Sequence, residues 1–133
     1  MLDIRNFAKR TPPALPYAEL AAQVLGQNYE LSLAFVGSAR SRALNLKLRG
    51  KDHAANVLSF PFDKKSGEII IDLMKATKEA KLGAESLTER VAVLFIHGLF
   101  HLKGYLHGSK MEAAETKVLK SLRLNAKSNR HRP

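Results

Sequence analysis

The segment from residue 86 to residue 104 carries a strong local structural signal. It opens with Ser86 and Glu89, the two residues of a helix capping box, and it closes with Gly104, a residue type that often ends helices. Apolar side chains recur between them at the intervals of one helix face, at Leu87, Val91, Leu94 and Phe95. The sequence therefore predicts one long central helix that runs through two histidines to Gly104.

Shorter elements are expected on both sides of this helix. Apolar spacing predicts further helices at residues 17–27, 38–49, 73–82 and from residue 109 onward. Apolar runs predict strands at residues 31–36 and 67–72, with a tight reversal at residues 63–67 before the second. The run NVLSFPF, residues 56–62, is expected to stop at Pro61. Three prolines at residues 12, 13 and 16 are expected to prevent regular structure early in the chain.

The order of these elements favours an α+β fold, with a small mixed β-sheet, packed helices and no internal repeat. The length of 133 residues suits a single domain. We expect residues 1–124 to form that domain and residues 125–133 to be a basic, disordered tail.

Composition limits where in the cell we expect the protein and which residue types could bind a metal. No apolar run reaches the ~18 residues needed to span a bilayer, and the first residues lack the apolar region of a signal peptide. We therefore expect a cytoplasmic protein without a membrane partner. Because the chain has no cysteine, histidine and carboxylate are its strong metal ligands.

The chain is strongly basic, with a formal net charge of +10. A polyanion, nucleic acid before membrane, is the partner that such a charge favours. Residues 36–51 hold five cations and no acid, and we predict that they bind RNA: Arg40, Arg42, Lys47, Arg49 and Lys51. A second group without acids begins at Lys117. The alternative for both groups is a solvated basic surface.

Three histidines fall within eleven residues in IHGLFHLKGYLHG. His97 and His101 are four residues apart, so a helix would project both imidazoles from one face. Gly104 would let the chain turn back and bring His107 to the same point. Three imidazoles and one open position describe a catalytic zinc site, in which the metal activates water. The alternative is that the imidazoles bond backbone carbonyls; His53 and His131 are not expected to be ligands.

The spacing HxxxHxxGxxH is also that of the metzincin proteases. In those enzymes a glutamate follows the first histidine and acts as the general base. Gly98 stands at that position here and has no side chain to accept a proton. The sequence therefore favours a metal site with three histidine ligands that does not hydrolyse peptides.

Three blocks of sequence resemble one known family. HGLFHLKGYLH is similar to HGxLHLxGYDH, the signature of the YbeY ribosomal RNA maturation endoribonucleases of bacteria. Upstream, LRGKDHAANVLSFPF looks like that family's YRxKDxPTDVLSFPF, and GEIII looks like its GDIVI. The blocks occur in the family's order and extend over about residues 31–111.

The resemblance implies a zinc ion held by His97, His101 and His107, and cleavage of RNA assisted by Arg49. It also implies a single-strand-specific endoribonuclease that acts on ribosomal RNA or ribosomal subunits, near the 3′ end of the small-subunit RNA. We expect His97 and Arg49 to be catalytic residues. A guanidinium at a helix end can clamp a phosphate, although it could instead only complement the helix C-terminus.

The family's strand block, matched by Ser59, Phe60 and Pro61, is expected to be a sheet edge facing the zinc cleft. Ser59 is not expected to be a nucleophile, because the zinc supplies one. Asp52 and Glu68 are the candidate proton acceptors.

Some positions depart from the family pattern. Leu106 replaces an aspartate, Ala55 and Asn56 replace a threonine and an aspartate, and Phe100 replaces a leucine. The lost carboxylates leave an alternative open, a non-catalytic zinc-containing factor that binds ribosomal RNA or the ribosome.

Overall fold

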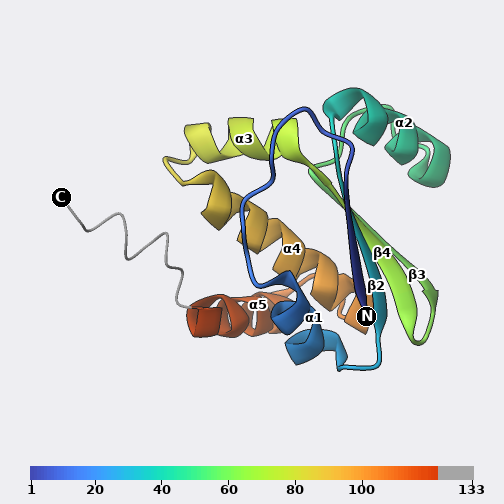
Figure 1. Ribbon diagram of the computed structural model, residues 1–133, viewed down its shortest axis with the longest axis vertical. Coiled ribbons are helices and arrows are strands. Elements are labelled where there is room, and N and C mark those ends of the chain that lie inside the picture. The colour runs from blue at the N-terminus through green and yellow to red at the C-terminus, as the bar shows by residue number, and fades with distance from the viewer. Residues whose placement is uncertain (123–133) are drawn as a thin grey trace.

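The chain forms a four-stranded sheet with most of its helices on one face (Figure 1). The computed structural model describes residues 1–122, and the predicted tail at residues 125–133 lies outside this range. The elements, in chain order, are β1 (Leu2–Asn6), α1 (Tyr17–Leu25), β2 (Glu30–Val36), α2 (Ser38–Arg49), β3 (Val57–Asp63), β4 (Ser66–Asp72), α3 (Leu73–Leu82), α4 (Leu87–Lys103) and α5 (Ser109–Leu122).

The sheet is mixed, as expected, with strand order β1-β2-β4-β3. β1 and β4 each pair with β2 in parallel, and β3 pairs with β4 in an antiparallel hairpin. β3 is therefore an edge strand, which confirms the place predicted for the block that contains Ser59.

The main core lies between one face of the sheet and the helices α1, α4 and α5. Leu33 and Phe35 of β2 and Ile69 and Ile71 of β4 point into it and are fully buried. On the other face, Ala34, Val36, Leu58 and Ile70 form a smaller cluster with Leu44 of α2. This alternation follows from the two-residue period of a strand, and it fixes which strand residues can face α4.

Two strand predictions need correction. β1 was not predicted, although Leu2 and Ile4 alternate with polar residues, and the prolines that discouraged it all follow the strand. β3 does not stop at Pro61 but continues to Asp63, with an irregular register between these two residues. An edge strand tolerates proline because its outer side donates no ladder hydrogen bond.

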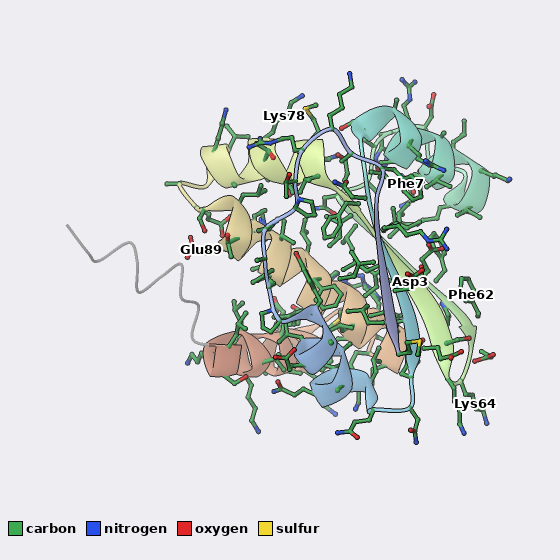
Figure 2. All side chains as sticks on the ribbon, viewed as in Figure 1. Asp3, Phe7, Phe62, Lys64, Lys78 and Glu89 are labelled. Atoms are coloured by element: carbon green, nitrogen blue, oxygen red, sulfur yellow. The ribbon has the colours of Figure 1, made fainter. Side chains whose placement is uncertain are left out.

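α4 has the predicted ends. Ser86 Oγ accepts a hydrogen bond from the Glu89 backbone N–H, and the Glu89 side chain accepts one from the Ser86 N–H; Figure 2 shows Glu89 in the first turn. Gly104 ends the helix in the left-handed conformation, at φ 101°. Within residues 1–122, no helix combines the length and apolar character needed to cross a membrane.

Candidate metal and phosphate cleft

Two imidazoles stand side by side near the end of α4. The Nε2 atoms of His97 and His101 are 3.1 Å apart, and their ring centroids are 4.6 Å apart. Two nitrogens bound to one tetrahedral zinc ion at ~2.0–2.1 Å would be about 3.3 Å apart. The helical spacing therefore presents the pair at close to the separation that a shared ion needs.

The turn after α4 brings the third histidine to this pair. The Gly104 N–H donates to the His101 carbonyl and the Tyr105 N–H to the Phe100 carbonyl, each over 3.0 Å. This is a Schellman motif, and its usual hydrophobic contact is made by Phe100 and Tyr105, with ring centroids 5.1 Å apart. His107 thereby comes within 4.5 Å of His101, measured between ring centroids.

The three histidines can hold one metal ion. One ring nitrogen from each lies within 4.8 Å of the other two, while His97 and His101 are partly buried and His107 is exposed. No metal-binding group of this kind other than His97, His101 and His107 occurs within residues 1–122. His53 is exposed in the loop after α2, and His131 lies beyond the part of the chain that the structure describes.

Glu115 of α5 contacts the histidine cluster at His97. Its Oε2 lies 2.5 Å from Nδ1 of His97, so a proton on Nδ1 leaves Nε2 free to face His101. Carboxylates usually orient metal-binding histidines through such contacts and make the ligating nitrogen more basic. The arrangement fits a metal ligand better than it fits a histidine satisfied by a backbone carbonyl.

The surroundings of His101 favour its neutral form. Partial burial lowers the pKa of this imidazole, and the positive charges of His97, His107 and Arg49 lower it further. Metal ions bind the neutral ring. The Arg49 guanidinium therefore lies close enough to His101 to lower its pKa.

A single cleft of about 560 Å³ contains the histidines and Arg49. Arg49 is the last residue of α2, which ends at Gly50 with φ 71°. The lining comes from α2, β3 and α4 and from the loops next to β3 and α4: Arg49, Asn56, Val57, Leu58, Ser59, Arg90, Val93, Leu94, His97, His101 and His107. The structure thus brings together the predicted metal ligands and the predicted phosphate-binding arginine.

Gly98 lies at the contact between α4 and the sheet. A Cβ added there would be 2.9 Å from Ser59 Oγ and 3.1 Å from two methyl carbons of Ile69. The glutamate of a metzincin would therefore meet the sheet at this position. Ser59 Oγ donates to the Gly98 carbonyl over 3.2 Å, so the hydroxyl proton of Ser59 already has an acceptor.

The other predicted RNA-binding cations do not line the cleft. Arg40 stacks its guanidinium on the exposed ring of Phe7, 4.4 Å from the centroid, and Arg42 pairs with Asp52 at 2.7 Å. Lys47 and Lys51 are exposed beside them. Figure 2 shows Phe7 next to α2, so this basic surface lies on the helix that carries Arg49.

Neither candidate proton acceptor reaches the histidines. Asp52 is paired with Arg42, whose hydrogen bond and charge lower the pKa of its carboxyl. Glu68 shares a sheet face with Ile70, whereas Ile69 points toward α4, so Glu68 lies on the opposite side of the sheet. No carboxylate is among the cleft-lining residues within residues 1–122.

The positions that depart from the family pattern lie close to this site. Asn56 lines the cleft and donates from Nδ2 to the carboxylate of Glu79 at 3.2–3.3 Å. Leu106, immediately before His107, is 86% exposed. Glu115 and Arg90 were not predicted. Glu115 meets His97 only through the packing of α5 against α4, whereas Arg90 has one local sign, its seven-residue spacing from His97, which repeats one helix face.

Comparison with known proteins agrees with this geometry. The sequence model of the family described as "Endoribonuclease YbeY" matches residues 4–126. Among curated relatives, the endoribonuclease YbeY of Alkaliphilus metalliredigens is 37% identical, over 72% of this chain and 69% of that protein. The endoribonuclease YbeY of Aromatoleum aromaticum is 33% identical, over 85% of this chain and 79% of that protein.

A solved structure supports the fold. The solution structure of TM1509 from Thermotoga maritima matches with a TM-score of 0.71 at 21% identity, covering 97% of this chain and 93% of that one. The family match, at residues 4–126, includes all three histidines and Arg49. The chain therefore belongs to the endoribonuclease YbeY family.

Proposed function

We propose that this protein is a zinc-dependent endoribonuclease that cleaves single-stranded RNA during ribosomal RNA maturation, near the 3′ end of the small-subunit RNA. Ribosomal RNA or ribosomal subunits are its proposed partners. The observation that carries the proposal is the placement of His97, His101, His107 and Arg49 in one cleft without a lining carboxylate among the described residues. Because the charged groups that line it are cationic, this cleft suits an anionic phosphodiester better than a neutral peptide bond.

In this proposal each side chain at the cleft has a separate role. His97, His101 and His107 hold the zinc, which supplies Lewis acidity and a nucleophile at neutral pH when bound. Glu115 holds His97 in the orientation that leaves Nε2 for binding. The Arg49 guanidinium donates to the oxygens of the scissile phosphate and stabilises the negative charge that develops there.

The basic surface of α2 extends phosphate binding beyond the cleft. Its exposed cations can contact the RNA backbone on one side of the scissile bond: Arg40, Arg42, Lys47 and Lys51. Such contacts release counterions, so affinity for RNA should fall steeply as salt is added.

One further observation favours a second candidate, a factor that binds zinc and ribosomal RNA without cleaving it. Asn56 and Leu106 occupy places where the resemblance implies carboxylates, and Asn56 already donates to Glu79. If catalysis requires one of those carboxylates, the cleft would still bind metal and RNA but turn over slowly.

Cleavage and binding can be measured on one preparation. The protein is incubated with a labelled single-stranded RNA and with the same sequence as a duplex, before and after treatment with a chelator. We expect cleavage of the single strand, its loss on chelation and its return with added zinc. Binding without cleavage in all conditions would favour the second candidate, and equal cleavage by metal-free protein would end the zinc proposal.

A further inference from the structure

Arg90 lies in the same row of α4 as the two helical histidines. Positions 90, 97 and 101 are seven and eleven residues apart, so all three side chains leave one face of the helix. At 1.5 Å per residue, Arg90 is about 10 Å from His97 along the axis. Both residues line the cleft, and Arg90 therefore marks a part of it well away from the metal centre.

The Arg90 side chain is partly buried and incompletely paired. It is 23% exposed, and its Nε is buried without a hydrogen-bond partner. The nearest carboxylate oxygen, from Glu85, is 3.7 Å from Nε, too far for a hydrogen bond. A phosphate that enters the cleft can accept charge-assisted hydrogen bonds from the terminal N–H groups of this guanidinium.

The two arginines of the cleft lie at different points along it. Arg49 enters the cleft from the end of α2, on a different element from Arg90. Arg90 is in the first turns of α4, about two turns before His97. Arg90 and His97 are ~10 Å apart along the helix axis. Separate phosphates of one strand therefore suit the two ends of the cleft better than one phosphate does.

We propose that Arg90 forms a second phosphate subsite, which holds an RNA phosphate outside the scissile position while Arg49 and the histidines hold the scissile one. The proposal rests on the proposed RNA-cleaving function. It makes the cleft a track for a strand with several phosphates, lined by α4 and by residues 57–59 of β3. A mononucleotide or free phosphate would use only one end of this track.

The test separates binding from cleavage and compares matched variants. Arg90→Gln removes the charge, Arg90→Lys keeps the charge but loses the fork of donors, and Lys78→Gln removes one charge from outside the cleft. Lys78 is exposed on the outer side of α3 (Figure 2). Affinity for a fluorescent single-stranded oligonucleotide is measured in chelator at several salt concentrations, and circular dichroism melting checks that each variant folds.

We expect Arg90→Gln to weaken binding of the oligonucleotide about tenfold, because a charge-assisted hydrogen bond is lost. Its dependence of log affinity on log salt should be shallower by about 0.7, the value for one phosphate contact on a single strand. Arg90→Lys should keep the salt dependence but not the full affinity. Lys78→Gln should bind as the wild type does.

The dependence of binding affinity on the length of the RNA is a second measurement. The wild type should bind an oligonucleotide much more tightly than a dinucleotide, which has one internal phosphate, and Arg90→Gln should lose most of that gain. Unchanged oligonucleotide binding by a folded Arg90→Gln variant would overturn the subsite, while cleavage by the wild type would still stand. A wild type that neither binds nor cleaves RNA would instead overturn the proposed function, and the subsite with it.

Discussion

The two walls of the cleft are built in different ways. The α4 wall belongs to a helix whose other side is in the core, with Phe95, Ile96 and Leu99 at most 1% exposed. The α2 wall belongs to a helix with only two buried residues, Ser41 and Asn45, both polar. Core packing therefore fixes the helix that carries His97 and His101, whereas the helix that carries Arg49 is held by hydrogen bonds and by the packing of Leu44.

Those hydrogen bonds tie α2 to the loop that follows it. Ser41 Oγ donates to the Ala55 carbonyl over 2.6 Å, and Asn45 Nδ2 donates to the His53 carbonyl over 2.8 Å. Leu46 and Leu48 of the same helix are about half exposed, at 49% and 50%. Replacing a histidine of the α4 wall should therefore remove metal binding and with it cleavage, whereas replacing Arg49 of the α2 wall should lower cleavage while leaving metal binding and the core intact.

Replacing a metal ligand should have the largest effect. His101→Ala removes one of three ligands and should lower cleavage by more than about 100-fold, because even outer partners of metal ligands contribute 10–100-fold. Bound zinc, measured by atomic absorption, should fall in parallel. His53→Ala, in an exposed loop, is the control and should retain both. Full activity in His101→Ala would place the reaction centre elsewhere.

Arg49→Ala tests the opposite wall. The loss of one donor to the developing charge should reduce kcat/KM for RNA by about 100-fold. Metal content and melting temperature should stay close to wild type, because Arg49 is exposed and lies at a helix end. Arg49→Lys should recover part of the activity. A variant that instead loses its metal would make Arg49 part of the metal centre and erase the contrast between the walls.

Glu115→Gln should have a smaller effect, confined to the α4 wall. The amide can no longer supply the charge that orients His97, so zinc affinity should fall by about 10–100-fold, measured by competition with a chelating dye. Glu112→Gln, an exposed position on the same helix, should bind zinc as the wild type does. Equal zinc affinity in Glu115→Gln and Glu112→Gln would show that the Glu115 contact contributes only packing and does not affect metal binding.

Local signals in the sequence were enough to predict most of the α4 wall. The capping box, the apolar period and Gly104 all act over a few residues, so the helix, its turn and the return of His107 could be predicted. Two residues were missed: Arg90 on α4 itself, and Glu115, whose contact with His97 depends on how α5 packs against α4. The candidate metal site is thus nearly a local property of the chain.

The α2 wall depended on long-range structure. Its helix and Gly50 were predicted, but not that Ala43 and Leu48 would be exposed while Ser41 and Asn45 were buried. Ser41 and Asn45 are buried because they form hydrogen bonds with the loop at residues 53–55. The spacing of apolar residues along a helix cannot predict such contacts. β1 was missed for a related reason, since an edge strand of five residues is stabilised by its pairing with β2.

Gly98→Ala tests the contact where α4 meets β3, and it should have the smallest effect. Alanine favours a helix interior by up to ~1 kcal/mol over glycine, so a free site would be stabilised. Here the new methyl group would lie 2.9 Å from Ser59 Oγ and 3.1 Å from Ile69. Overpacking costs about 1–3 kcal/mol, so the free energy of unfolding, measured with urea, should fall by about 1 kcal/mol. Ser59→Ala in the same chain removes the nearest atom and should restore part of the loss, whereas a stabilised Gly98→Ala variant would show that the α4 wall is less tightly packed than its buried face suggests.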